Sequence, residues 1–111
     1  MSKRFDYAKE HDIFAVHNGF QEGDKFFGNE MIGDLVLDVS TQKRIVGIEV
    51  LNASQYLEKF GVDEEILSNL IDVDLTATLH SDGATVTLVL KTKKATIPIK
   101  IAVQLETPLP I

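Results

Sequence analysis

The sequence predicts an α+β fold, mainly antiparallel sheet, with two short helices between two blocks of β-strands. Three observations lead to this prediction. Apolar, β-branched runs separated by turn residues occupy both halves of the chain, as expected for β-hairpins. Two stretches with helical spacing and helix-stop residues lie between those halves. The length of 111 residues suits one domain, so we take residues 1–111 as a single domain.

The amino-terminal half is expected to form two hairpins. Within residues 3–17, aromatic residues alternate with polar ones, and a turn and a short apolar run follow. Residues 18–33 hold four glycines and two adjacent phenylalanines, and we expect a loop followed by a short strand. The second hairpin pairs residues 35–39 with 45–51. Their near-continuous apolar character indicates a sheet covered on both faces, or a central position in it.

The middle of the chain is expected to form two short helices. Asn52 is followed three residues later by Gln55, a variant of the capping box, and Gly61 is placed to end this first helix. Asp63 is placed to cap the second helix, whose first turn is acidic as the helix dipole favours. The buried positions expected from helical spacing are Ala53, Leu57 and Phe60 in the first helix and Ile66, Leu67, Leu70 and Ile71 in the second.

The carboxy-terminal part is expected to form a three-stranded meander. Asp82-Gly83 is a strong two-residue turn signal, because both positions of the favoured hairpin turn need positive φ. A second turn is expected at Lys93-Lys94. The two turns place one set of apolar residues on a single face. The expected pairs on that face are Leu79–Val86, Ala77–Leu88 and Leu75–Leu90 across the first turn, and Leu90–Ile97, Leu88–Ile99 and Val86–Ile101 across the second.

Two further expectations concern how this meander is placed. Pro98 lacks a backbone donor, which indicates an edge strand or a missing donor that points to solvent. The apolar face of the meander needs a cover, and we expect the two striped helices to supply it from one side of the sheet.

Composition excludes several classes of function. Seventeen acidic and eleven basic residues give a net charge of −6, which disfavours nucleic acid and anionic membranes and mildly favours basic partners. The absence of cysteine excludes disulfides, thiolate metal sites and thiol nucleophiles. Neither a membrane-spanning apolar run nor the apolar core of a signal peptide is visible, so we expect a cytoplasmic protein.

The chain shows no obvious catalytic motif. Its histidines, His11, His17 and His80, lack the spacing of a helical zinc pair. His17 and Asp12 share the predicted first hairpin, but a metal site normally takes three or four ligands. The basic run 91–94 has no neighbouring aromatic residue for base stacking. We therefore expect no metal, no cofactor and no direct contact with nucleic acid.

Two groups of residues are candidates for a site. Asp34, Asp38 and Glu49 approach one another if the second hairpin pairs as proposed, and paired carboxylates perform acid–base chemistry when their pKa values separate. We favour a structural or interface role for them. The outer face of the meander is nearly uncharged and suited to packing against another surface. Its candidate interface residues are Thr76, Thr78, Thr85, Thr87 and Val89.

Three segments together resemble a family of small prokaryotic domains of unknown function. They are YAKEHDIFAV (7–16), GDLVLDV (33–39) and IVGIEVLNAS (45–54). The family typically shows a Tyr-Asp-x-x-x-Asp-x-Leu-Tyr-Ile strand and a Val-Gly-Ile-Glu-Ile-Leu-x-Ala-Ser ending. The resemblance covers residues 5–57 and leaves 58–111 as an extension. Its signature positions in this chain are Tyr7, Asp12, Asp38, Gly47, Glu49, Asn52, Ala53 and Ser54.

The resemblance implies no catalytic residue, and members of that family are suspected of pairing with small toxin-like proteins as antitoxins. We therefore expect a non-enzymatic protein-interaction module, with self-association into a homo-oligomer as its first form. An antitoxin-like partner of a small basic toxin is the alternative. A carboxylate-based enzyme or metal binder is the second alternative.

Overall fold

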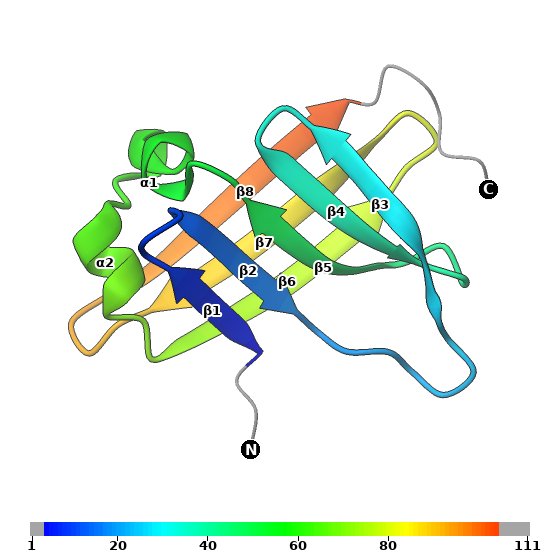
Figure 1. The fold of residues 1–111 in the computed structure, drawn as a ribbon, viewed down its shortest axis with the longest axis horizontal. Coiled ribbons are helices and arrows are strands. Elements are labelled where there is room, and N and C mark those ends of the chain that lie inside the picture. Colours follow the sequence, from blue (N-terminus) through cyan, green and yellow to red (C-terminus); the bar gives the residue numbers. More distant parts are fainter. Residues whose placement is uncertain (1–3, 105–111) are drawn as a thin grey trace.

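A computed structural model describes residues 4–104 (Figure 1). Within that range the chain forms eight strands, two α-helices and one 3-10 helix. In chain order these are β1 (Phe5–Ala8), β2 (Ile13–His17), β3 (Phe26–Ile32), β4 (Leu35–Ser40), β5 (Ile45–Val50), α1 (Ala53–Tyr56), the 3-10 helix (Glu58–Phe60), α2 (Glu64–Ser68), β6 (Asp72–Leu79), β7 (Gly83–Lys91) and β8 (Thr96–Gln104).

The strands form two antiparallel sheets. One has five strands in the order β1-β2-β5-β4-β3, and the other has three in the order β6-β7-β8. The predicted α+β class, the amino-terminal hairpins and the carboxy-terminal meander are therefore confirmed. β5 is the central strand of the larger sheet and β4 lies beside it, as their continuous apolar runs predicted. β3 and β8 are edge strands, which agrees with the edge position inferred from Pro98.

The two sheets pack face to face, and the helices close one end of the space between them (Figure 1). The prediction that the two helices would cover the apolar face of the meander is therefore wrong, because they cover only one end of it. Helices of four and five residues are too short to cover strands of eight and nine, so the five-stranded sheet supplies most of the cover. One core cluster joins all parts, including Phe14, Leu37 and Ile48 from the larger sheet, Leu57 and Leu67 from the helices, and Leu88, Leu90 and Ile99 from the meander.

The pairing of β6 with β7 differs from the predicted register by two residues. Leu79 lies opposite Ala84, where the sequence predicted Val86. The two-residue loop is 81–82, closed by a hydrogen bond from the backbone N–H of His80 to the carbonyl oxygen of Gly83 at 2.8 Å. Because the shift is even, every side chain keeps its predicted face. The register across the second turn is confirmed, and its pairs are Leu90–Ile97, Leu88–Ile99 and Val86–Ile101.

Gly83 explains why the turn prediction went wrong. Its φ is not in the left-handed region, so it is not a turn glycine of the predicted kind. A Cβ at this position would lie 2.2 Å from the carbonyl oxygen of Val103. Gly83 therefore allows β8 to approach β7 closely, and that requirement is absent from the local sequence pattern.

The helix ends follow the predicted signals at most positions. Gly61 ends the 3-10 helix with φ of 78°, and the Asp63 carboxylate accepts a hydrogen bond from the backbone N–H of Ile66 at 2.9 Å. Ile71 is the exception, because its side chain is 58% exposed and not part of the buried stripe. No helix in residues 4–104 is long and apolar enough to cross a membrane.

The loop between β2 and β3 is fastened to the β4–β5 turn by Asp24. Its side chain is fully buried and accepts a hydrogen bond from Arg44 at 2.9 Å, and another from the backbone N–H of Gln42 at 3.2 Å. Burial alone would raise the pKa of Asp24. The hydrogen bonds from Arg44, Ser40 and Gln42 and the charge of Arg44 outweigh burial and hold that pKa below its ordinary value.

This lowered pKa predicts how stability depends on pH. The contribution of Asp24 is complete above the unfolded-state pKa, about 3.9, and is lost as the pH falls through the lower folded-state pKa. Asp24→Asn should lower the free energy of unfolding by about 1–3 kcal/mol at pH 7. The difference from the unsubstituted protein should shrink below pH 4, as measured by urea denaturation. Glu22→Gln, an equal charge change in the same loop, is the control. A difference that stays constant down to pH 2 would contradict this assignment.

Candidate functional site

The candidate site lies on the outer face of the five-stranded sheet, which points away from the core. In the register of β2, β5 and β4, Gly47 stands between His17 on one side and Asp38 on the other. Glu49 lies two residues further along β5 on the same face. Three adjacent strands thus place an imidazole and two carboxylates around one glycine.

Gly47 is needed there for space and not for its backbone conformation. Its φ is not in the left-handed region. A Cβ at this position would lie 2.6 Å from Cδ2 of His17, 2.9 Å from Oδ2 of Asp38 and 3.1 Å from the carbonyl oxygen of Val16. The His17 and Asp38 side chains therefore extend over the glycine, and a larger residue would displace them.

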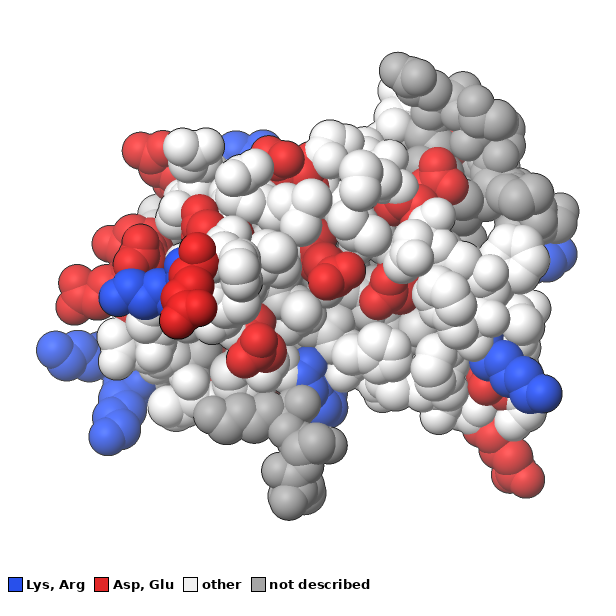
Figure 2. Space-filling model, in the orientation of Figure 1, with Lys and Arg blue, Asp and Glu red and all other residues white. Residues whose placement is uncertain are grey.

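These side chains border an open depression of about 270 Å³. Four of its lining residues are apolar, four are acidic residues or histidine, and one is arginine. They are Phe5, Ala15, Val16, Ile48, Asp6, His17, Asp38, Glu49 and Arg4. Figure 2 views this face of the molecule, where acidic side chains stand in a mostly uncharged surface and most basic ones lie toward its periphery.

Hydrogen bonds hold two of these side chains in place. Nδ1 of His17 accepts a hydrogen bond from the backbone N–H of Gly19 at 2.8 Å, so the neutral ring carries its proton on Nε2. The Phe20 ring packs edge-on against His17 with centroids 5.3 Å apart. Oδ1 of Asp38 accepts a hydrogen bond from the side-chain amide of Asn29. The orientation of both groups is therefore set before any ligand arrives.

The depression is electrostatically negative. Arg4 is the cation that lines it, but this guanidinium is used elsewhere: it lies 3.5 Å from Asp74 and 3.9 Å from Asp72, and it donates to the carbonyl oxygen of Val73 at 3.3 Å. Within residues 4–104, the side chain of Glu49 has no hydrogen bond or ion pair. The carboxylates here are therefore not neutralised within the described chain.

The structure brings together two of the three carboxylates named from the sequence. Asp38 and Glu49 share the depression, but Asp34 does not line it, and Asp34 instead accepts a hydrogen bond from the Asn52 side chain at 3.3 Å. His17 and Asp6 join the site, although the sequence did not associate them with it. Within the described residues, no group of three or more His, Cys, Asp and Glu side chains has a geometry that could hold a metal ion.

Three further residues that the family resemblance marks, Tyr7, Asp12 and Ser54, fasten the first hairpin to the start of α1. The Asp12 carboxylate accepts hydrogen bonds from the Tyr7 hydroxyl at 2.6 Å and from the Ser54 hydroxyl at 2.7 Å. It also accepts from the backbone N–H of Ser54 at 3.1 Å, while the carbonyl oxygen of Asp12 accepts from the N–H of Ala53 at 2.9 Å. We call Tyr7, Asp12 and Ser54 the hairpin–helix clamp.

This clamp corrects the predicted capping box. Asn52 does precede the helix, but it has φ of 49° and its side chain caps no backbone N–H. Asp12, distant in sequence, supplies the side-chain acceptor in its place, because the left-handed Asn52 directs the chain so that Ser54 faces the hairpin. The role inferred for the segment 52–54, turning the chain from strand to helix, still agrees with the structure.

The ionisation of the clamp follows from its hydrogen bonds. Burial alone would raise the pKa of Asp12, but hydrogen bonds from Tyr7 and Ser54 favour the carboxylate and hold its pKa below the ordinary value. Burial, together with the hydrogen bond to Asp12, raises the pKa of the Tyr7 hydroxyl. The clamp is therefore a charged acceptor between two neutral donors at physiological pH.

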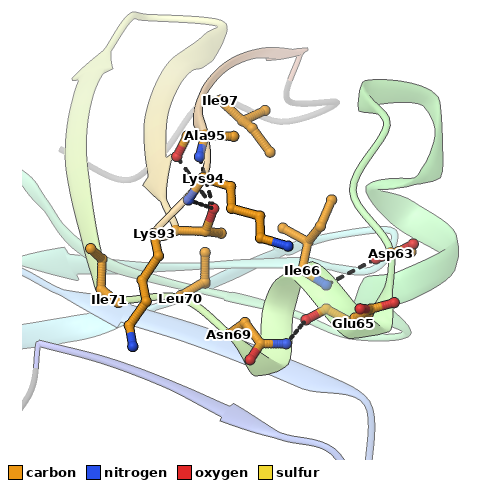
Figure 3. Close-up of a pocket in the computed structure, with 11 residues that line it drawn as sticks. Asp63, Glu65, Ile66, Asn69, Leu70, Ile71, Lys93, Lys94, Ala95 and Ile97 are labelled. Carbon is orange, nitrogen blue, oxygen red and sulfur yellow. Dashed lines mark hydrogen bonds between the residues drawn. The ribbon is translucent and has the colours of Figure 1, made fainter.

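A larger hollow of about 650 Å³ lies between α2 and the β7–β8 turn (Figure 3). Its floor is apolar, one rim carries the lysines of the turn, and the other carries acidic residues of α2. The residues that define it include Ile66, Leu70, Ile97, Lys93, Lys94 and Glu65. Because charges of both signs border this groove, its electrostatics select no particular ligand.

The predicted threonine interface forms the outer face of the meander. Thr76 and Thr78 are exposed, whereas Thr85, Thr87 and Val89 on the central strand are half-buried. Its use as an interface stays a prediction.

The clamp predicts a measurable loss of stability on truncation. Asp12→Ala removes a helix cap and the charged partner of two hydroxyls, so we expect the free energy of unfolding to fall by about 2–3 kcal/mol in urea denaturation. Tyr7→Phe removes one of these hydrogen bonds and should cost about 1 kcal/mol. An Asp12→Ala protein as stable as the unsubstituted one would contradict the clamp.

Comparison with known proteins identifies one uncharacterized relative of this chain. No known family profile matches it, and no solved structure is a match. Over 89 residues it is 32% identical to uncharacterized protein MJ0789 of Methanocaldococcus jannaschii, an alignment that spans 79% of this chain and 72% of the archaeal protein. That name assigns no activity, so the biological role of the protein is unknown. The chain belongs to the same family as this uncharacterized archaeal protein.

Proposed function

We propose that the protein is a non-enzymatic interaction module of the cytoplasm that binds other protein chains through its five-stranded sheet. The observation that favours this most is the exposure of large apolar side chains on edge strand β3. Phe26, Phe27 and Met31 are 53%, 54% and 65% exposed. Phe20, in the loop before β3, is 46% exposed. An apolar edge strand is a surface that proteins ordinarily cover or pair.

The edge itself supports pairing with another strand. β3 is seven residues long, and Glu30 is its one charged residue. An edge strand presents backbone donors and acceptors on its free side, which an added strand can satisfy. The sequence placed the two phenylalanines in a loop-and-strand segment without recognising this edge.

A second copy of this chain is the first partner we propose. Antiparallel pairing of two β3 strands about a twofold axis makes each copy present the same patch to the other, as in an isologous dimer. The apolar residues of one strand then cover those of its partner. Two β3 strands can pair in spite of the net charge of −6, because each carries a single charged residue and repulsion between them is therefore small.

The second candidate partner is a small basic protein, which is what an antitoxin-like module would bind. The net charge of −6 and the negative depression over Gly47 favour it. The carboxylate-based enzyme has weaker support, because Asp34 lies apart from Asp38 and Glu49.

Self-association through β3 is tested by the double variant Phe27→Ser/Met31→Ser. Light scattering coupled to size exclusion should give the unsubstituted protein a mass well above the 12.3 kDa of one chain. The variant should elute as a monomer, because the apolar contact is lost. Ile71→Ser is the matched control, since this residue is equally exposed at 58% but lies outside the sheet.

Two results would contradict the proposal. One is an unsubstituted protein that is strictly monomeric and retains no protein in a native pull-down. The other is an assembly that β3 substitutions leave intact.

A further inference from the structure

We propose that the free edge of β6 binds an extended acidic segment of a partner protein, which joins the three-stranded sheet as a fourth strand. This inference goes beyond the proposed function, because it concerns the other sheet of the molecule. The site is a depression of about 370 Å³, which we call the β6 slot. Residues 75–79 of β6 form one side of the slot, and Asn18 with residues 43–45 forms the other.

The register of the meander shows which backbone groups of β6 are free. The N–H of His80 donates to the carbonyl oxygen of Gly83 at 2.8 Å. Along two antiparallel strands, a hydrogen-bonded pair of residues alternates with a non-hydrogen-bonded pair. The even-numbered residues of β6 therefore bond to β7, and the backbone groups of residues 73, 75, 77 and 79 point to the free edge.

Side chains cover only the first part of this edge within residues 4–104. Arg4 donates to the carbonyl oxygen of Val73 at 3.3 Å, and the side-chain amide of Asn18 donates to that of Leu75 at 2.8 Å. In the described chain, no hydrogen bond reaches Ala77 or Leu79 from this side. The β6 slot borders these two residues, so the uncovered part of the edge faces a space that a peptide can enter.

The charge of the slot selects an acidic segment. Among the described residues that line it, two are basic and none is acidic, in a chain whose net charge is −6. Lys43 is exposed and has no ion pair within residues 4–104. Arg44 bonds to Asp24 but keeps 38% of its side chain exposed, and its buried Nε has no acceptor in the described chain. Both cations would therefore attract a carboxylate that enters the slot.

The edge itself selects a peptide backbone and not a small anion. Proteins commonly protect an exposed edge strand with charged residues or proline. β8, the opposite edge of this sheet, carries Pro98 and Lys100, whereas residues 75–79 of β6 include neither a charged residue nor a proline. Free backbone donors and acceptors on such an edge are satisfied by an added strand. The volume of the slot also lies in the range of about 300–1,000 Å³ that is usual for binding sites.

The test is amide NMR of the full chain with the pentapeptide Ac-Thr-Glu-Val-Glu-Thr-NH₂ as the probe. The Ala77 and Leu79 amides should shift on saturation and exchange with solvent more slowly, because they become hydrogen-bonded. The amides of Thr76 and Thr78, which already bond to β7, are the internal control. The same peptide with glutamine in place of glutamate should bind about three- to fivefold less tightly, because the cations then meet no carboxylate.

Backbone pairing is tested separately by N-methylation of the probe. An added strand bonds to its neighbour through every second residue, so alternate amides of the peptide face β6. We compare one peptide methylated at both glutamates with another methylated at the valine and the second threonine. One of the two should lose binding and the other should keep it.

Variants of the protein test the same two contacts. Ala77→Pro removes an N–H that faces the free edge, costs no bond to β7 and should abolish binding. Lys43→Gln should weaken binding about three- to fivefold. Lys94→Gln, an equal charge change at the β7–β8 turn, should leave the affinity unchanged.

Several results would overturn the inference. Undiminished binding of the glutamine peptide, or by Lys43→Gln, would show that the cations do not recognise the acidic side chains. Equal binding of the two methylated peptides would exclude strand addition. The same shifts with inorganic phosphate would assign the slot to a small anion. Shifts of the Ala77 and Leu79 amides on dilution of the protein alone would assign the edge to a second copy.

The β6 slot and the β3 contact can fail separately. Phe27→Ser/Met31→Ser should leave peptide binding unchanged, because β3 lies in the other sheet. Lys43→Gln should likewise leave the mass in solution unchanged.

Discussion

The Asp12 carboxylate makes the contact on which the arrangement of this fold depends. Two elements far apart in sequence, the first hairpin and the strand-to-helix junction after β5, meet at this one side chain. β2 pairs with β5 directly beside it, so the clamp and the sheet register support each other. Asp12 is therefore the point at which the hairpin, the central strand and the first helix are fixed together.

Six of the residues that the family resemblance marks divide into two groups with different physical roles. Tyr7, Asp12 and Ser54 hydrogen-bond to one another, and their role is to stabilise the fold. Asp38, Gly47 and Glu49 are not explained in this way, because they lie on the outer face and leave carboxylates without cationic partners. Residues that stability does not require are the ones to examine for function. This division supports placing the contact surface on the five-stranded sheet.

Local signals in the sequence predicted most elements, and long-range pairing decided the rest. Gly61, Asp63 and the Lys93-Lys94 turn each act within a few residues, so their roles were visible in the sequence. The clamp joins residues 42 positions apart, so no local pattern shows that Asp12 caps α1. His17 and Asp38 flank Gly47 only because β5 lies between β2 and β4. The turn predicted at Gly83 was wrong because the close approach of β8 requires the glycine there. That contact is long-range, so the local turn signal does not reveal it.

A side-chain carboxyl NMR titration of Asp12 tests the central claim most directly, with the Ser54 amide followed in the same experiment. The account predicts that Asp12 titrates below the ordinary value of about 3.9. The Ser54 amide signal should move with the same midpoint, because this N–H donates to that carboxylate. An Asp12 that titrates at or above its ordinary pKa, with a Ser54 amide that does not respond, would contradict the account.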